Sequence, residues 1–374
     1  MKNIINILFL AILVISVISC NNSFDEKEEI NDSIKSNKSE KDLLINFLET
    51  NGNFVNSDKI PALVLASELE SEKENCMLID LRKHDDYILG HIDGAINVKY
   101  EQLYDYMFDT VVASVHKKIV FIGYNGQEES FATSVFRILG FGNVYSLKFG
   151  MSAWNKKFAN DYWLSAIGND YANKLETTNN PKNQSSELPE ITTGNITGYD
   201  IAKAQAKKVL AVIENNFITI DELMQNPQNF YIINYWDTAR YLIGHLPGAV
   251  QYEPDKSLSK DKSLLTIPKD KIVVVYCFSG QLSAQVVAFL NILGYNAKSL
   301  QYGNNSFMFN IMKSKNEIGK SFDASTNIMD FTFVEGELPS LKTTYSTTES
   351  SENKEAPKVN IQIKKETKKS SGGC

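Results

Sequence analysis

Apolar and polar residues along the middle of the chain form a pattern of short buried strands that are followed by helices. In the second half, residues 230–234 and 272–276 are apolar or β-branched runs, and residues 283–293 have the apolar spacing of a helix that Gly294 ends. Near-continuous apolar strands that alternate with helices are typical of a parallel sheet covered by helices on both faces. The pattern therefore predicts an α/β fold.

The chain also contains an internal repeat at an offset of 154 residues. The matching positions are Ile79-Asp80-Leu81-Arg82 with Ile233-Asn234-Tyr235-Trp236, Gly90-His91 with Gly244-His245, Gly126-Gln127 with Gly280-Gln281, and, with one residue dropped, Leu147, Gly150 and Trp154 with Leu300, Gly303 and Phe307. So many matches at one offset indicate two homologous domains. We expect the first over residues 41–165 and the second over residues 199–325, joined by a polar linker over residues 166–198.

Residues 1–20 have the pattern of a lipoprotein export signal. Lys2 precedes an apolar run over residues 4–18, which is shorter than the roughly 20 residues that a membrane-spanning helix needs. The following Ser19-Cys20 completes a segment that resembles the lipobox of bacterial lipoproteins. This predicts a signal peptide over residues 1–19 and a lipid anchor on Cys20. The chain would then be exported to the bacterial cell envelope, on the periplasmic side of the outer membrane if the cell is Gram-negative. The alternative is an ordinary secretory signal in which Cys20 has no role.

Polar segments rich in Ser, Lys and Glu lie at both ends of the mature chain. We expect a flexible tether over residues 20–40 and a flexible tail over residues 326–374. The tail ends at Cys374, and a flexible segment of about 30 residues has a span of roughly 30 Å. Cys374 could therefore reach a thiol of the second domain, as a sulfur acceptor or a resolving thiol. The alternative is a solvated end without a role.

Composition narrows the classes of function. The chain is 43% hydrophobic and 22% charged, which is close to the average of globular proteins and excludes a mostly disordered or multi-span membrane protein. Its formal charge of −7 argues against nucleic acid as a partner. The 4 cysteines lie far apart and the 4 histidines are scattered, so we expect no disulfide framework, no metal and no cofactor.

One cysteine is placed for chemistry. Cys277 directly follows the strand predicted over residues 272–276 and precedes the helix predicted over residues 283–293. Backbone N–H groups and the positive end of a helix dipole converge at such a position and favour the thiolate. Gly280 allows the turn that aims these N–H groups inward. The alternative is a buried structural cysteine, which is the role that we assign to Cys76.

The repeat resembles the rhodanese-homology domain of sulfurtransferases. The resemblance rests on Asp80-Leu81-Arg82, on Gly-His-Ile-Asp-Gly-Ala-Ile at residues 90–96, on Gly-His-Leu-Pro-Gly-Ala at residues 244–249, and on the loop of Cys277. It implies that Cys277 takes a sulfane sulfur from a donor, holds it as a persulfide and passes it to an acceptor. The substrate-binding loop that stabilises the terminal sulfur would then be Phe278, Ser279, Gly280, Gln281, Leu282 and Ser283.

The two domains differ where the resemblance matters. Gly123 stands in the first domain where Cys277 stands in the second, so we expect the first domain to be inactive. In the second domain, Asn234 and Trp236 replace Asp80 and Arg82, and residues 278–283 contain no Lys or Arg. The donor therefore stays open between thiosulfate, mercaptopyruvate and a protein persulfide. Phe278 and Leu282 favour a less polar donor, and Arg240 is a nearby cation whose direction the sequence does not show.

The sequence thus predicts an envelope-anchored sulfurtransferase with two tandem rhodanese-like domains. A phosphatase with the same loop geometry would need an arginine six residues after the cysteine, where Ser283 stands. The partners of the predicted sulfurtransferase would be a small sulfur donor or a protein persulfide, and the membrane through Cys20. The alternative is a non-catalytic lipoprotein in which the rhodanese fold serves for interaction or redox sensing.

Overall fold

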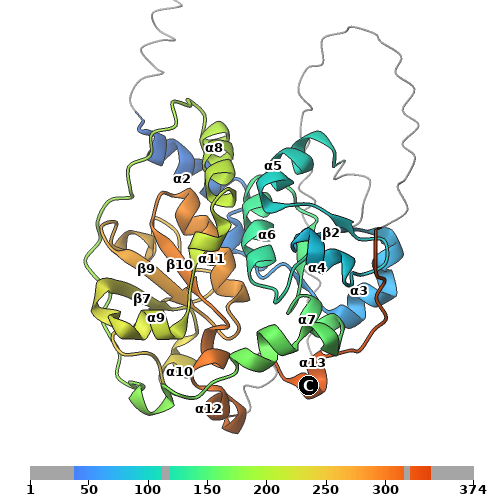
Figure 1. Ribbon diagram of the computed structural model, residues 1–374. Coiled ribbons are helices and arrows are strands. Elements are labelled where there is room, and N and C mark those ends of the chain that lie inside the picture. Colours follow the sequence, from blue (N-terminus) through green and yellow to red (C-terminus); the bar gives the residue numbers. More distant parts are fainter. Residues whose placement is uncertain (1–37, 112–117, 316–320, 338–374) are drawn as a thin grey trace, which may run out of the picture. The chain divides into compact units, whose positions relative to one another are not determined.

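The computed structural model describes residues 38–111, 118–315 and 321–337, and it contains two parallel sheets with the same strand order (Figure 1). The first sheet has the order β1-β5-β4-β2-β3, and the second has the order β6-β10-β9-β7-β8. The strands of the first sheet are β1 (Leu63–Val64), β2 (Cys76–Asp80), β3 (Ile96–Asn97), β4 (Lys118–Ile122) and β5 (Val144–Leu147). Those of the second are β6 (Phe217–Ile218), β7 (Phe230–Asn234), β8 (Val250–Gln251), β9 (Ile272–Tyr276) and β10 (Ala297–Leu300).

Helices connect the strands of each sheet. In the first domain they are α3 (Ala66–Glu72), α4 (His84–Ile88), α5 (Tyr100–Asp109), α6 (Glu128–Ile138) and α7 (Met151–Trp154). In the second they are α8 (Gly198–Leu210), α9 (Ile220–Gln225), α10 (Thr238–Tyr241), α11 (Gln281–Ile292) and α12 (Phe309–Ser314). The predicted tandem α/β fold is confirmed, and both strands predicted in the second domain have the observed bounds. The predicted helix begins two residues earlier, at Gln281, because the turn at Gly280 already directs the chain into it.

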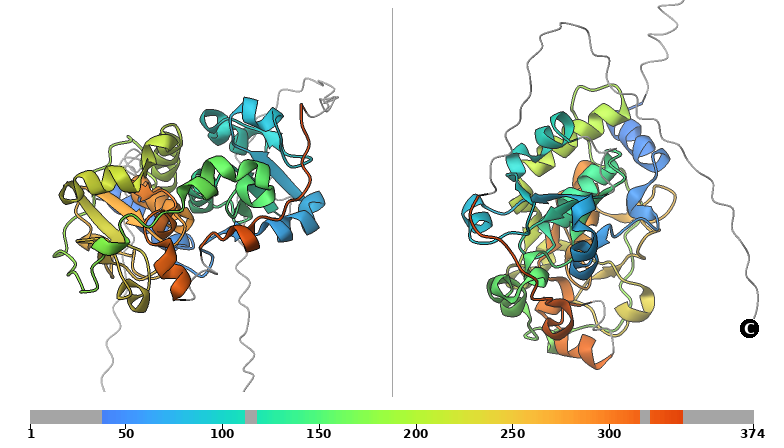
Figure 2. Two further views of the ribbon diagram at one scale, coloured as in Figure 1. Left: turned by 60° about the horizontal axis from the view of Figure 1, so that its bottom comes forward. Right: turned by 90° about the vertical axis from the view of Figure 1, so that its right-hand side faces the viewer.

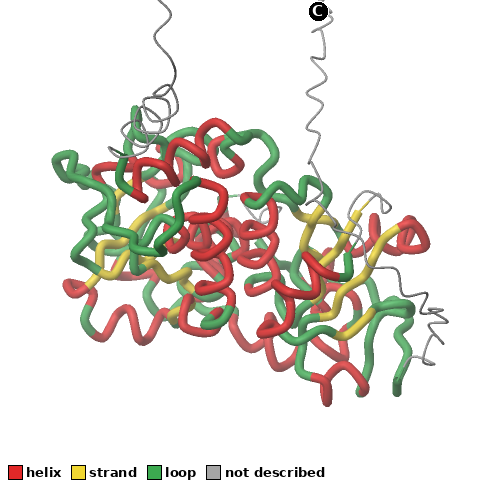
Figure 3. Tube along the Cα trace, turned by 90° about the horizontal axis from the view of Figure 1, so that it is seen from above, coloured by secondary structure: helices red, strands yellow, loops and turns green. Residues whose placement is uncertain are grey.

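The two domains pack together through α6 and α11, which lie side by side between the two sheets (Figures 1 and 3). One continuous apolar core contains residues of both helices, such as Phe131 and Val135 of α6 and Ala284 and Val287 of α11. In addition, the Ser134 hydroxyl donates to the backbone carbonyl of Gln285 at 2.8 Å. Because these helices follow the loops of Gly123 and Cys277, their packing also brings the two loops together.

The helix that opens the described chain, α2 (Glu40–Thr50), packs on α8 of the second domain. The Glu40 carboxylate accepts hydrogen bonds from the backbone N–H groups of Thr193 and Gly194, at 2.7 and 2.8 Å. Gly198 allows the close approach, because a Cβ atom there would overlap the Leu43 carbonyl oxygen. Helix α2 therefore packs on the surface of the second domain.

A segment at the other end returns to the first domain (Figure 2). Residues 328–336, which the sequence analysis places in the flexible tail, follow the short helix α13 (Ala324–Asn327) and contact the first domain. His91 and Val334 exchange two backbone hydrogen bonds of 2.9 Å, and the Trp154 indole donates to the Thr332 carbonyl at 2.8 Å. The aromatic rings of Phe331 and Phe333 are partly buried there against apolar side chains, which is why this part of the predicted tail is ordered.

Several predictions concern residues outside the described ones. These are the signal peptide, the lipidated Cys20, most of the tether and the tail with Cys374. Among the described residues, no helix has both the length and the apolar character needed to cross a membrane.

Candidate active site

Cys277 lies where β9 ends and the loop to α11 begins. Its Sγ atom accepts a hydrogen bond from the backbone N–H of Ser283 at 3.3 Å, and the thiol lies 3.5 Å from the Ser283 hydroxyl. Gly280, which precedes α11, has a φ of +80°, the left-handed conformation that glycine adopts without strain. The loop therefore turns at Gly280 and places one backbone N–H, that of Ser283, against the sulfur atom. Cys277 itself is only 1% exposed.

Ser283 belongs to a buried chain of hydroxyl groups beneath the sulfur. Its Oγ atom donates to the Gly280 carbonyl at 3.1 Å and lies 2.8 Å from the hydroxyl of Ser299 on β10. These contacts fix the rotamer of Ser283 and keep its hydroxyl next to Cys277. Of the residues predicted to stabilise a terminal sulfur, Ser283 is thus the one whose backbone and side chain both reach Sγ.

The other predicted loop residues take different positions. The Ser279 hydroxyl accepts from the Gln281 side-chain amide at 3.0 Å, and Leu282 packs against the apolar core between the domains. The Phe278 ring lies on the indole of Trp236, with the ring centroids 4.5 Å apart. The structure therefore brings together Cys277, Gly280 and Ser283, while the contacts described for the side chains of the remaining loop residues lie elsewhere.

A turn over residues 302–305 packs against the Cys277 loop. The sequence analysis did not assign this turn a role. A Cβ atom at Gly303 would overlap the Cys277 carbonyl oxygen and lie 2.8 Å from the Gly280 nitrogen. Asn304 N donates to the Cys277 carbonyl at 3.0 Å, and the Asn305 side chain donates to the Phe278 carbonyl at 2.7 Å. The repeat held a signal for this turn, because Gly303 matches Gly150, which makes the same close approach to the Gly123 loop.

Comparison with known proteins agrees with this geometry. The model of the Rhodanese-like domain matches the chain twice, over residues 65–157 and 219–309. The thiosulfate sulfurtransferase GlpE of Shewanella oneidensis is 31% identical over 86 residues, which are 23% of this chain and 82% of that protein. The chain belongs to the rhodanese family of sulfurtransferases.

Another relative is matched over a smaller share of its own length. The tRNA uridine(34) hydroxylase of Buchnera aphidicola is 28% identical over 152 residues, which are 39% of this chain and 47% of that protein. The chain therefore spans about half the length of this relative. Among solved structures, a thiosulfate sulfurtransferase from Pseudomonas aeruginosa aligns with 69% of this chain and 46% of its own, at 16% identity and a TM-score of 0.26.

The strand end beside the loop differs between the two rhodanese domains. In the first domain, Arg82 and Asp80 form a buried bidentate ion pair. Arg82 Nε donates to Asp80 Oδ1 at 3.0 Å and Nη2 donates to Oδ2 at 2.7 Å, and the guanidinium also donates to the Gly90 carbonyl. In the second domain, Asn234 and Trp236 stand at these positions. The polar side-chain atoms of Asn234 and the Trp236 indole N–H are buried without a hydrogen-bond partner within the described residues. The second rhodanese domain has therefore exchanged a buried ion pair for an aromatic cover.

Arg240, the candidate cation of the sequence analysis, points towards this cover. Its guanidinium lies 5.8 Å from the centroid of the Phe278 ring and forms an ion pair with Asp237. The Asp237 carboxylate offsets its charge. The loop of the second rhodanese domain therefore has a cation at its edge, but one with a counter-charge already in place.

The equivalent loop of the first rhodanese domain is filled by its own side chain. A Cβ atom at Gly123 would lie 2.5 Å from Glu129 Oε2, and Gly126 N donates to Glu129 Oε1 at 2.8 Å. Burial raises the pKa of Glu129 to about 8, and the nearby Glu128 contributes, against backbone N–H groups that lower it. A carboxyl group thus occupies the position of the sulfur atom, which gives the predicted inactivity of this domain a second structural cause besides the missing cysteine.

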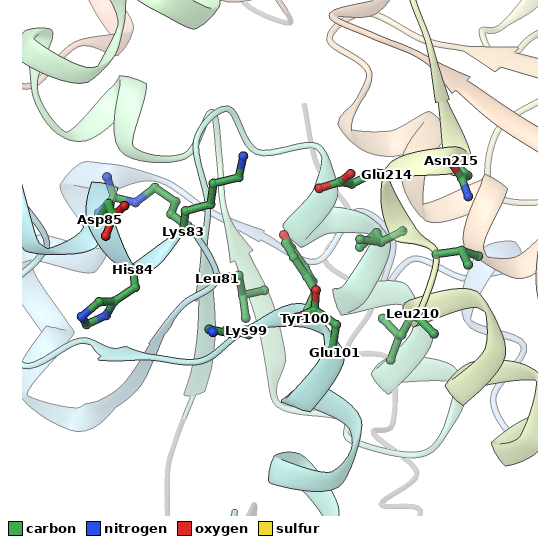
Figure 4. A pocket seen from close by; sticks show the side chains of 14 residues that line it. Leu81, Lys83, His84, Asp85, Lys99, Tyr100, Glu101, Leu210, Glu214 and Asn215 are labelled. Atoms are coloured by element: carbon green, nitrogen blue, oxygen red, sulfur yellow. The ribbon is translucent and has the colours of Figure 1, made fainter.

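A cleft of about 520 Å³ lies between the two rhodanese domains, away from Cys277. It is bounded by the segment that follows β2, by the start of α5 and by the residues after α8. Figure 4 shows Lys83 and Tyr100 on one side of this space and Glu214 on the other. The pKa of Glu128 is raised to about 7 by burial and by the charge of Glu214, while Lys83 acts in the opposite direction. The cleft is separate from the loop of Cys277, which contributes none of its lining residues.

Proposed function

We propose that this protein is an envelope-anchored sulfurtransferase in which Cys277 carries sulfane sulfur as a persulfide. The observation that carries the proposal is the position of Sγ at the start of α11, within reach of the backbone N–H and the hydroxyl of Ser283. The N–H donates to the sulfur, and the hydroxyl, which accepts from the thiol, can turn its proton from the Gly280 carbonyl to the thiolate, so both groups favour an anion on the sulfur. Membership in the rhodanese family and the similarity to a protein named thiosulfate sulfurtransferase support the same reaction class.

The reaction consists of two displacements on sulfur. The Cys277 thiolate attacks the sulfane sulfur of the donor, the sulfur–sulfur or sulfur–carbon bond of the donor breaks, and the leaving group keeps the electron pair. The terminal sulfur of the new persulfide carries the negative charge, which the N–H groups of the loop stabilise. A nucleophilic acceptor then attacks this terminal sulfur and releases the Cys277 thiolate. The enzyme returns to its starting state without any other reactant.

The walls of the loop bear on the choice of donor. Residues 278–283 provide no cation, and Arg240 at the edge is paired with Asp237. A small dianion such as thiosulfate would therefore be held by backbone dipoles alone. The aromatic pair of Trp236 and Phe278 favours a less polar donor, such as mercaptopyruvate or a persulfide presented by another protein.

Mass spectrometry of the full chain tests the proposal directly. The protein is incubated with thiosulfate, mercaptopyruvate or polysulfide, and the gain of one sulfur atom is assigned to a cysteine by peptide mapping. We expect the gain on Cys277, its loss in Cys277→Ser, and its retention in Cys76→Ser and Cys374→Ser. If no donor loads Cys277 although the thiol still reacts with iodoacetamide, the sulfurtransferase proposal fails.

A second candidate function is a non-catalytic role in interaction or redox sensing. The observation that favours it is the burial of Cys277 together with the uncharged loop around it. Under this alternative, Cys277 would form a disulfide under oxidants and would not be loaded by sulfur donors. Cys374 lies outside the described residues, and we propose it as the thiol that takes sulfur from Cys277 or forms a disulfide with it. Unchanged turnover, donor range and redox state in Cys374→Ser would exclude that role.

The proposed location depends on Cys20, which also lies outside the described residues. Its support is the charged and apolar pattern of residues 1–20. Metabolic labelling with a fatty acid, followed by separation of membranes from soluble protein, tests the anchor. We expect the label and the membrane fraction in the natural chain, and neither in Cys20→Ala.

A further inference from the structure

The loop of the active rhodanese domain touches a side chain of the inactive one. Gln127 belongs to the first rhodanese domain and is only 1% exposed. Its Oε1 atom accepts a hydrogen bond from the backbone N–H of Tyr302 at 2.7 Å. A Cβ atom at Gly280 would overlap the same oxygen atom, so Gln127 also occupies the space beside the turn of the Cys277 loop.

Tyr302 has a strained backbone conformation. Its φ of +60° lies in the left-handed region, which is strained for a residue with a side chain and persists only where the surroundings hold it. The first domain holds it at both ends. Gln127 binds its N–H, and the Asn125 side chain donates to its hydroxyl at 3.2 Å. The ring also packs edge-on against Trp163, with the ring centroids 5.0 Å apart.

The turn that begins at Tyr302 reaches the reactive cysteine directly. The next residue, Gly303, lies against the Cys277 carbonyl and the Gly280 nitrogen, and Asn304 N donates to the Cys277 carbonyl. A shift of Tyr302 would therefore move the backbone that supports both Cys277 and Gly280. A continuous series of hydrogen bonds and close backbone contacts therefore joins Gln127, the 302–304 turn and the Cys277 loop.

We propose that Gln127 of the inactive domain is a positioning residue for the Cys277 loop of the active domain. Gln127 does not touch the sulfur atom or a reacting group. It acts by holding Tyr302 and, through the turn after it, the backbone of the loop that directs the Ser283 N–H at Sγ. The inactive domain thus supplies a part that the active domain lacks. This inference rests on the proposed role of Cys277 as the reactive thiol.

The test measures the reactivity of the thiol rather than turnover. The full chain is treated with iodoacetamide from pH 5 to pH 10, and alkylation of Cys277 is quantified by peptide mass spectrometry. In Gln127→Met, which keeps the length of the side chain but removes the acceptor, we expect the midpoint of the pH profile to move upwards. The rate at pH 7 should fall at least threefold. The matched control is Ser134→Ala. This variant removes a hydrogen bond of 2.8 Å between α6 and α11, and Ser134 has no described contact with the Cys277 loop.

The outcomes separate positioning from general stability. A shifted midpoint in Gln127→Met and an unchanged one in Ser134→Ala support the proposal. An unchanged midpoint in Gln127→Met, or the same shift in both variants, overturns it. If Gln127→Met does not fold, Asn125→Ala replaces it. The Asn125 side chain donates to the Tyr302 hydroxyl and accepts from the backbone N–H of Gln127 at 3.1 Å, so this variant loosens both residues and should move the midpoint in the same direction. Failure of every donor to load Cys277 would overturn the proposed function but would leave this result unaffected.

Discussion

Gln127 and Gln281 occupy equivalent positions in the two rhodanese domains and reach across to each other's domain. Gln127 Oε1 accepts from Tyr302 N at 2.7 Å, and Gln281 Oε1 accepts from Phe149 N at 2.9 Å. Phe149 matches Tyr302 in the repeat and, like it, has a left-handed backbone, with a φ of +66°. Each domain therefore stabilises a strained turn of the other. The exchange is symmetric in structure, but only one of the two turns supports a cysteine.

The first prediction concerns the hydrogen bond between Gln281 and Phe149. Gln281→Met would leave the N–H of Phe149 buried without a partner, which costs about 1 to 3 kcal/mol of unfolding free energy. Denaturation in urea measures this loss. The matching control is Leu282→Met, a change of similar size at the adjacent position, which removes no hydrogen bond. Equal stability of the two variants would contradict the exchange.

The second prediction concerns the carboxyl group in the inactive loop. The pKa of Glu129 is raised by burial to about 8 in the folded protein, against about 4.5 for an exposed glutamate. The folded state therefore keeps a proton that the unfolded state loses, so the contribution of Glu129 to stability is present below about pH 4.5 and is lost as the pH rises to about 8.

Glu129→Gln removes this titration. Since each pKa unit corresponds to about 1.4 kcal/mol, the difference in unfolding free energy between the variant and the natural protein should grow by a few kcal/mol between pH 5 and pH 9, in favour of the variant. Urea denaturation at several pH values measures it. Parallel pH profiles of the two proteins would show that Glu129 titrates normally.

The third prediction is that a cysteine cannot be restored to the first domain by one substitution. In Gly123→Cys, the new Cβ atom would collide with the Glu129 carboxyl group, so we expect a clear loss of thermal stability. Gly123→Cys combined with Glu129→Ser removes the collision and copies the cysteine and serine of the second domain. The double variant should regain stability, and its introduced thiol should react with iodoacetamide. A single variant as stable as the natural protein would contradict this account of the inactive loop.

The fourth prediction separates the Ser283 hydroxyl from its backbone N–H. Ser283→Ala removes the hydroxyl 3.5 Å from Cys277 Sγ but keeps the N–H at 3.3 Å. A hydrogen bond contributes about 1 kcal/mol, so the rate of sulfur loading should fall by about threefold to tenfold. Ser130→Ala is the matched control, because Ser130 pairs with Ser146 in the first domain as Ser283 pairs with Ser299 in the second. An unchanged loading rate in Ser283→Ala would remove the hydroxyl from the mechanism.

Much of the architecture could be predicted from local sequence patterns. The apolar runs at residues 230–234 and 272–276 had the observed bounds, since a buried parallel strand needs a continuous apolar segment. The repeat predicted two domains of the same topology, and Cys277 at the end of a strand marked the candidate loop. The match of Gly150 with Gly303 served only as evidence of the repeat, and the close approach of two backbone segments that both glycines allow came from the structure.

The sequence by itself therefore determined the fold class, the family resemblance and the position of the candidate reactive cysteine, because these depend on residues that are neighbours along the chain. The tertiary structure alone decided which residues meet across longer separations. Examples are Gln127 with Tyr302, Val334 with His91, and Glu40 with Thr193. Such contacts depend on how two packed helices bring distant loops together. A single polar side chain or a short apolar segment carries no local pattern that identifies its partner.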